Sequence, residues 1–108
     1  MTVLIAFDCD GTIDISNPIG PIPVSGLYEL NIPPYIQIVI VSASPFCAQL
    51  PFPRFVSNNT RLENLLAASL RYPAMLNIYV SDNPGDEITA KNAGFCYIHP
   101  KDFNLPFK

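Results

Sequence analysis

Short apolar runs alternate with helix-like segments along the chain. Five apolar runs predict strands, at residues 3–7, 35–41, 54–56, 75–80 and 95–98. Helix-like segments lie between them, at residues 24–30, 44–50, 60–72 and 86–93. A run that is apolar at nearly every position is typical of a strand covered on both faces. The alternation therefore predicts a mostly parallel five-stranded sheet between two helical layers, a three-layer Rossmann-like α/β domain.

The segment at residues 60–72 carries the strongest helix signal. Thr60 and Glu63 have the spacing of a capping box at a helix start. The stripe that follows is largely apolar and consists of Leu62, Leu65, Leu66, Ser69 and Leu70. Ser44 is expected to cap the shorter helix at residues 44–50, because Pro45 follows at the first helical position.

Size and composition indicate one globular domain over residues 1–108. The chain has 108 residues, of which 49% are hydrophobic and only 14% charged. Such a low share of charged residues favours self-association into a homo-oligomer. The net charge of −3 disfavours a sequence-independent nucleic-acid binder, which normally carries a basic patch.

The N-terminus and the cysteines predict a cytoplasmic protein. No apolar run approaches the roughly 20 residues of a membrane span, and the start "MTVLIAF" lacks the features of a signal peptide. Cys9, Cys47 and Cys96 are far apart and odd in number, which fits a reducing compartment. With His99 as the single histidine, a zinc site is not expected.

Polar residues follow the predicted strands directly. Asp8 and Asp10 come after the first strand, Ser42 after the second, and Asp82 and Asp86 after the fourth. Ligands of parallel α/β sheets bind at the carboxyl ends of the strands. Carboxylates that converge there require a cation or a shared proton. A ligand set made only of oxygen atoms suits Mg²⁺.

The stretch "DCDGT" combines several groups that bind phosphate. In an extended chain Asp8 and Asp10 point to the same side, whereas Cys9 points away into the core. Gly11 allows backbone N–H groups to face a ligand, and the hydroxyls of Thr12 and Ser42 can donate to an anion. A carboxylate at such a site can act as the nucleophile and form an aspartyl phosphate, which water hydrolyses.

Two other interpretations of "DCDG" remain open at this point. An Asp-Gly pair between apolar runs is also a strong hairpin signal. The stretch further resembles a calcium-binding loop, but Ala6 and Asn17 stand where that loop has an aspartate and a bidentate glutamate.

Three motifs in order resemble those of the haloacid dehalogenase (HAD) superfamily of phosphotransferases. They are "DCDGT", "VIVSAS" and "YVSDNPGDEITAKNAGF", and the resemblance covers nearly the whole chain. It implies that Asp8 is the nucleophile and a Mg²⁺ ligand. Asp10 would bind the metal through its backbone carbonyl and act as general acid and then general base. The second acid favours phosphate over carbon–halogen chemistry, since the dehalogenating members lack it.

The resemblance also assigns the remaining polar residues. Thr12 would help to hold the turn, and Ser42 would donate a hydrogen bond to the phosphoryl group. Asp82 would be the second carboxylate ligand of Mg²⁺, with Asp86 in or just outside the ligand shell.

The family's third motif is a cation that neutralises the phosphoryl group, and no lysine stands between the second and fourth predicted strands. Arg54, Arg61 and Arg71 are the candidates. Arg61 stands at the start of the strongest helix, where a helix N-terminus also favours anions, and its guanidinium can bind phosphate with two hydrogen bonds.

The segments between the motifs are too short for the cap domain that this family usually carries. The proline-rich stretch "IDISNPIGPIP" is the expected flap beside the site. We therefore expect a capless, Mg²⁺-dependent phosphomonoester hydrolase that acts through an aspartyl phosphate on Asp8. Its partner would be a phosphorylated substrate of unknown identity. A non-catalytic phosphate- or metal-binding module is the alternative, and a nucleic-acid end phosphatase is disfavoured by the acidic charge.

Overall fold

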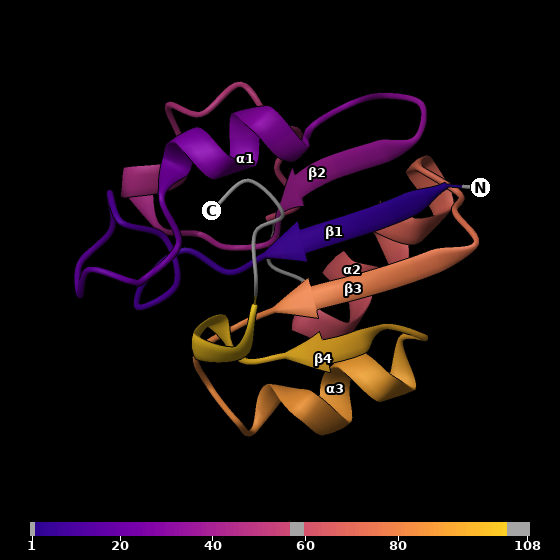
Figure 1. The fold of residues 1–108 in the computed structure, drawn as a ribbon. Coiled ribbons are helices and arrows are strands. Elements are labelled where there is room, and N and C mark those ends of the chain that lie inside the picture. Colours follow the sequence, from indigo (N-terminus) through magenta and orange to yellow (C-terminus); the bar gives the residue numbers. More distant parts are fainter. Residues whose placement is uncertain (1, 57–59, 104–108) are drawn as a thin grey trace.

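The computed structural model describes residues 2–56 and 60–103 of the chain. Its strands are β1 (Val3–Phe7), β2 (Ile36–Ile40), β3 (Leu76–Val80) and β4 (Cys96–Ile98), and its α-helices are α1 (Val24–Leu30), α2 (Arg61–Arg71) and α3 (Asp86–Asn92). Two 3₁₀ turns, η1 (Pro45–Cys47) and η2 (Pro100–Asp102), complete the elements. All four strands run parallel in the order β2-β1-β3-β4, as their arrows show in Figure 1. The parallel α/β architecture is confirmed.

The expectation of five strands is wrong for the described residues, because residues 54–56 form no strand. Their segment is hydrogen-bonded to the end of β2: the Ile40 N–H donates to the Pro53 carbonyl at 2.8 Å, and the Phe55 N–H donates to the Ile40 carbonyl at 2.8 Å. Proline has no N–H to extend a ladder, and it precedes a run of only three residues. The sheet therefore has four strands, with a single bridge at its β2 edge.

The register of the sheet places the ends of three strands at one level. Phe7, the last residue of the central strand β1, pairs with Ile40 of β2 on one side and with Val80 of β3 on the other. The residues that follow these three positions therefore leave the sheet at the same edge. Asp8 is the first of them on the central strand, between the loops after β2 and β3.

Each face of the sheet has its own apolar core, which confirms the three layers. Ile5 and Phe7 of β1 pack in one cluster with Leu27 of α1. Leu4 and Ala6 alternate with them and pack in a second cluster, with Leu65 and Ala68 of α2, Ala90 of α3 and Ala93 directly after α3. Side chains alternate along a strand, so β1 needs an apolar residue at every position.

Helix α2 begins as the sequence predicts. The Thr60 hydroxyl accepts the Glu63 N–H at 3.2 Å, and the Glu63 carboxylate accepts the Thr60 N–H at 3.4 Å. This capping box fixes the first residue of the helix, Arg61, next to the sheet edge.

The proline-rich flap folds back against the loop after β1. The Ile22 N–H donates to the Thr12 carbonyl at 3.1 Å. Gly20 lies so close that a Cβ there would stand 2.1 Å from the Thr12 carbonyl carbon. The flap also reaches α1, since the Asp14 carboxylate accepts the Val24 N–H at 3.1 Å.

The connections that precede α1 and α2 contain no helical domain within the residues described here. In the same residues, no helix has the length and the apolar character needed to cross a membrane.

Candidate active site

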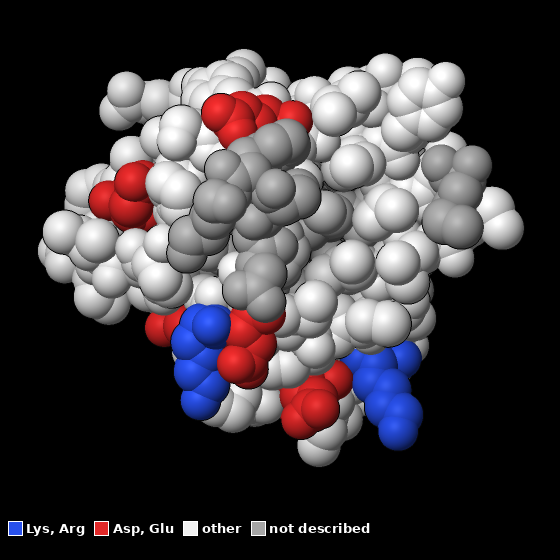
Figure 2. Space-filling view, viewed as in Figure 1, with Lys and Arg blue, Asp and Glu red and all other residues white. Residues whose placement is uncertain are grey.

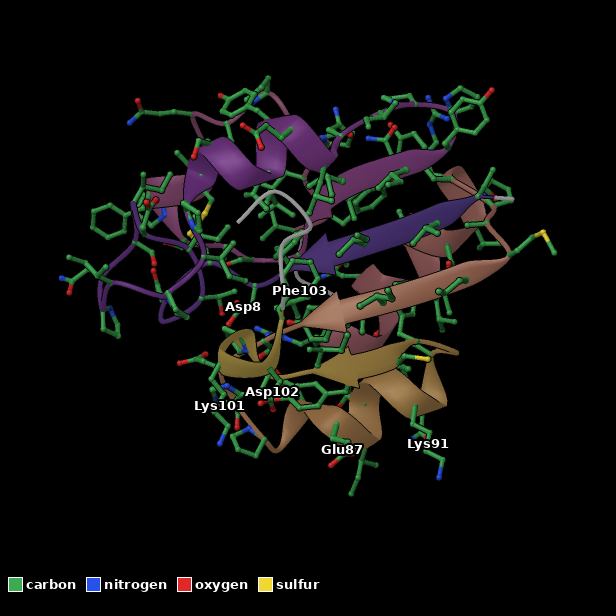
Figure 3. All side chains as sticks on the ribbon, viewed as in Figure 1. Asp8, Glu87, Lys91, Lys101, Asp102 and Phe103 are labelled. Carbon is green, nitrogen blue, oxygen red and sulfur yellow. A yellow bond between two sulfur atoms is a disulfide. The ribbon has the colours of Figure 1, made fainter. Side chains whose placement is uncertain are left out.

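Asp8 occupies the carboxyl end of the central strand. Figure 3 shows it just beyond the arrowhead of β1. Its N–H donates to the Val80 carbonyl at 2.9 Å, which continues the ladder between β1 and β3. Its side chain is only 13% exposed. Phe103 covers the same end of β1, with its ring 5.5 Å from the ring of Phe7 in an edge-to-face contact.

Arg61 reaches Asp8 from the start of α2. Its Nη1 lies 3.6 Å from Asp8 Oδ1 and donates to Asp86 Oδ2 at 3.0 Å. The same nitrogen donates to the Tyr79 hydroxyl, and the guanidinium lies over the Tyr79 ring, 5.9 Å from its centre. The capping box fixes the start of α2, and this start places the Arg61 guanidinium beside Asp8, the predicted nucleophile.

Asp86 anchors this arrangement from the start of α3. It is buried, and its Oδ2 accepts the Ser81 hydroxyl at 2.7 Å in addition to Arg61. Sequence reasoning places Ser81 directly after the strand but assigns it no role. It missed Tyr79, because the tyrosine stands inside an apolar run and gave no signal.

The environment of Asp8 changes the pKa of its carboxyl group, mainly because the group is shielded from water. Burial raises the pKa of Asp8 from 3.8 to about 6. The Arg61 guanidinium and a hydrogen bond from the Cys9 backbone lower this pKa, and the carboxylates of Asp82 and Asp86 raise it. Burial also raises the pKa of Tyr79, together with the Asp8 carboxylate, so its phenol stays protonated.

The Asp82 carboxylate lies close to Gly11 in the loop after β1. Gly11 has φ of +76°, and a Cβ on it would stand 2.0 Å from Asp82 Oδ2. Only glycine combines this backbone conformation with room for the carboxylate. Two backbone N–H groups of this loop are bonded within the protein, because Gly11 donates to the Pro18 carbonyl at 2.7 Å and Thr12 donates to the Cys9 carbonyl at 3.0 Å. That N–H groups of the loop face a ligand stays a prediction.

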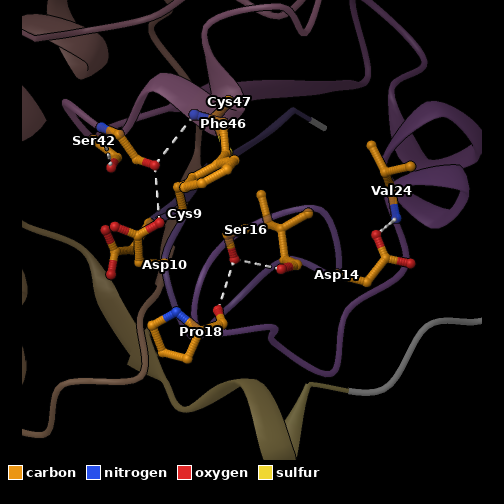
Figure 4. The surroundings of a disulfide bond; sticks show 12 residues. Cys9, Asp10, Asp14, Ser16, Pro18, Val24, Ser42, Phe46 and Cys47 are labelled. Carbon is orange, nitrogen blue, oxygen red and sulfur yellow. Dashed lines mark hydrogen bonds between the residues drawn. A yellow bond between two sulfur atoms is a disulfide. The ribbon is translucent and has the colours of Figure 1, made fainter.

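Ser44 holds Asp10. Its hydroxyl donates to Asp10 Oδ1 at 2.8 Å and accepts the Phe46 N–H at 3.4 Å (Figure 4). The second contact confirms Ser44 as an N-cap, of the 3₁₀ turn η1. The first was missed, although Ser44 lies two positions after Ser42 and extended residues at that spacing share a side. Ser42 accepts the Ser44 N–H at 3.1 Å and can still donate its own proton.

A disulfide joins the two loops that carry these residues. Cys9, between the two aspartates, is bonded to Cys47 at the end of η1, across 38 positions of sequence (Figure 4). Both are buried in the core on the α1 side of the sheet, as expected for Cys9. The expectation that the cysteines are reduced is wrong for this pair. Cys96 is a free cysteine and is exposed.

Thr12 lies beneath the flap. It is fully buried, and its hydroxyl has no hydrogen-bond partner among the residues that the structure describes. A buried hydroxyl without a partner costs free energy, so it stands ready to donate to an anion. Its donation to a phosphate stays a prediction, because the flap covers it.

The other two candidate cations lie elsewhere. Arg54 takes part in the bridge to Ile40 at the edge of the sheet. Arg71 stacks on the Tyr72 ring at 4.7 Å and lines a hollow of about 270 Å³ with Thr2 and Val3, at the start of β1. Of the three arginines, Arg61 alone is within 4 Å of a predicted site carboxylate in the described part of the chain.

The donors present fit a magnesium ion, although they are not assembled into a cage. No group of three His, Cys, Asp or Glu side chains within residues 2–56 and 60–103 is arranged to hold a metal ion. Mg²⁺ usually takes one or two carboxylates and completes its shell with water and substrate phosphate. Asp8 and Asp82 supply two carboxylates at one edge of the sheet, and the Asp10 carbonyl belongs to the same loop as Asp8.

No family model, curated protein or solved structure matches this chain.

Proposed function

We propose that the chain is a capless, Mg²⁺-dependent phosphomonoester hydrolase of the HAD type. One observation carries the proposal: the central strand ends in a shielded aspartate, Asp8, with the Arg61 guanidinium 3.6 Å away. A carboxylate beside a fixed cation can receive a phosphoryl group, because the cation stabilises the charge that gathers on the phosphoryl oxygens. Asp10 lies two positions further along the same loop, and Asp82 lies in the loop after β3.

The proposed reaction has two steps. An Asp8 carboxylate oxygen attacks phosphorus while the bond from phosphorus to the alcohol oxygen breaks, and Asp10 gives its proton to that oxygen. Water then attacks the phosphorus of the aspartyl phosphate and passes a proton to Asp10. The bond between phosphorus and Asp8 breaks, which releases inorganic phosphate and restores both aspartates.

The other side chains bind and orient in this scheme. Arg61 and the Ser42 hydroxyl bind the phosphoryl oxygens, and Thr12 supplies a further hydroxyl when the flap moves. Asp86 holds Arg61, because its Oδ2 is already shared by Arg61 and Ser81. We place it just outside the metal ligands. Asp8, Asp82 and the Asp10 carbonyl would hold Mg²⁺, which supplies charge stabilisation at the phosphoryl oxygens.

The test is phosphate release from a panel of phosphomonoesters with Mg²⁺ and with EDTA. We expect activity with Mg²⁺, its loss in EDTA, and a loss of at least about a thousandfold in Asp8→Asn. Asp102→Asn, at an exposed aspartate of η2, is the matched control and should leave the rate unchanged. Full activity of Asp8→Asn would exclude the aspartyl phosphate, and full activity in EDTA would exclude the metal.

A non-catalytic phosphate-binding module is the second candidate. The missing lysine favours it, since the segment between β2 and β3 contains no lysine that could take the place of the family's third motif. Binding of inorganic phosphate without turnover of any ester in the panel would support this alternative.

Nucleic acid is a poor fit as the substrate. On the face shown in Figure 2, basic side chains lie at the lower edge beside acidic ones, and uncharged residues cover most of the rest. Nucleic-acid binding normally requires a continuous basic surface. A phosphorylated small molecule or protein therefore remains the proposed partner, and self-association through the weakly charged surface is a further proposal.

A further inference from the structure

We propose that a hollow beside Ser44, lined by four apolar residues and one amide, binds the alcohol part of the substrate, so that the preferred phosphomonoesters carry an uncharged group with apolar surface. This inference rests on the proposed function and names the substrate class for the same site. The hollow has a volume of about 550 Å³. Its lining consists of Ile15, Pro45, Phe46, Gln49 and Leu50.

The hollow is built from the two loops that carry the proposed chemistry. Ile15 belongs to the flap, three positions after Thr12, and Pro45 directly follows Ser44. The Ser44 hydroxyl is hydrogen-bonded both to Asp10 and to the N–H of Phe46 (Figure 4). The Ser44 hydroxyl therefore fixes Asp10, the proposed general acid, relative to Phe46, which lines the hollow.

The geometry of phosphoryl transfer directs the alcohol part to this side. The attacking and the leaving oxygen lie roughly in line through phosphorus, so the leaving oxygen is on the side away from Asp8. The general acid must come within hydrogen-bond distance of that oxygen. Atoms attached to the leaving oxygen would then lie near Asp10 and Ser44, whose neighbour Pro45 lines the hollow.

The lining selects against charge. Four of its five residues are apolar and the fifth, Gln49, is an uncharged amide. Phe46 is nevertheless 44% exposed and Ile15 is 38% exposed, so both offer apolar surface to a ligand. Without a Lys or Arg in the described lining, a second anionic group on the substrate would lose water without gaining a partner.

The experiment compares two esters of primary alcohols, 2-phenylethyl phosphate and glycerol 3-phosphate. Both leaving groups are alkoxides, so the comparison reports on binding of the alcohol part. We expect kcat/KM to be about tenfold or more higher for the phenylethyl ester. Phe46→Ala should reduce that ratio about fivefold or more, mainly through KM. Tyr35→Ala, at a 63% exposed aromatic residue that precedes β2, should leave the ratio unchanged.

A second variant adds the charge that the hollow lacks. Gln49→Lys should raise kcat/KM for 3-phosphoglycerate, whose alcohol part carries a carboxylate, relative to the phenylethyl ester. A ratio near one in the wild-type protein, or an unchanged ratio in Phe46→Ala, would overturn the assignment of the hollow.

If no ester is hydrolysed, the proposed function fails, and equilibrium binding then decides on the hollow. Phenylethylphosphonate should bind about tenfold more tightly than methylphosphonate, and Phe46→Ala should remove the difference. Equal affinities of the two phosphonates would overturn the inference independently of turnover.

Discussion

The two sides of Asp8 are held by different means. On one side, Arg61, Ser81 and Asp86 come from the start of α2, the end of β3 and the start of α3, and charged hydrogen bonds join them. We call this the ionic side. On the other side, Asp10 and Ser44 come from the loops after β1 and β2, which the Cys9–Cys47 disulfide joins; we call it the loop side.

The backbone of the two sides is supported in different ways. Regular elements packed on the sheet already fix the backbone of the ionic side, so its charges have only to orient side chains. The loops after β1 and β2 lack that support, and the covalent bond supplies it. We therefore expect changes on the ionic side to alter chemistry and pH dependence, and loss of the disulfide to alter the stability of the fold.

The largest effect is expected from removing the disulfide. Cys9→Ala together with Cys47→Ala should lower the free energy of unfolding by about 2–4 kcal/mol, because the bond restricts the unfolded chain across 38 positions. Urea unfolding measures it, and Cys96→Ala at the exposed free cysteine is the control. If the double variant were as stable as the control, the disulfide would not support the loop side.

On the ionic side, Arg61→Ala should lower kcat/KM about a hundredfold, because the transferring phosphoryl group loses its cation. Arg61→Lys should recover part of the rate, since it restores the charge without the two-pronged geometry. Arg71→Ala, at the far end of α2, should have no effect on steady-state rates. Equal rates for Arg61→Ala and Arg71→Ala would contradict the role of Arg61.

The raised pKa of Asp8 predicts a pH-dependent effect on stability in EDTA. The pKa is about 6 in the folded protein and near 3.8 when unfolded, so folding favours the protonated acid. This contribution is complete below about pH 4 and is lost as the pH rises through about 6. Asp8→Asn should therefore stabilise the fold by about 1–3 kcal/mol at pH 7 and hardly at pH 4.

Urea unfolding at the two pH values measures this difference, with Asp102→Asn as the exposed control. An equal effect of Asp8→Asn at both pH values would show that burial does not raise the pKa of the Asp8 carboxyl group.

The smallest effect is expected for Ser44→Ala, which frees Asp10 without removing it. We expect kcat for alkyl phosphates to fall about tenfold, with a smaller loss for p-nitrophenyl phosphate, because nitrophenolate leaves without a proton. Ser25→Ala, at an exposed serine of α1, serves as the control. A loss of the same size for both kinds of ester would assign Ser44 to structure rather than to positioning of Asp10.

The sequence predicts the parallel layers and the residues at the strand ends, because both follow from local patterns. Apolar residues at every position of β1 require two covered faces, and the capping box at Thr60 places Arg61 at the start of α2. The strand proposed at residues 54–56 failed because so short a run depends on its neighbours rather than on its own composition.

Contacts between distant loops could not be predicted in the same way. The bond between Cys9 and Cys47 depends on the path of two loops, and cysteine spacing alone does not give the pairing. The hydrogen bond from Ser44 to Asp10 depends on the same path. The ionic side was easier to anticipate, since Asp86 and Arg61 each stand at the first residue of a helix.

The close approach of Asp82 to Gly11 makes two positions that are distant in sequence depend on each other. A side chain at position 11 would occupy the present place of the Asp82 carboxylate, and the φ of +76° would strain it in addition. A substitution of Gly11 would therefore displace the carboxylate of Asp82 while leaving residue 82 itself unchanged. Gly11 thus acts on the proposed metal ligands without being one of them.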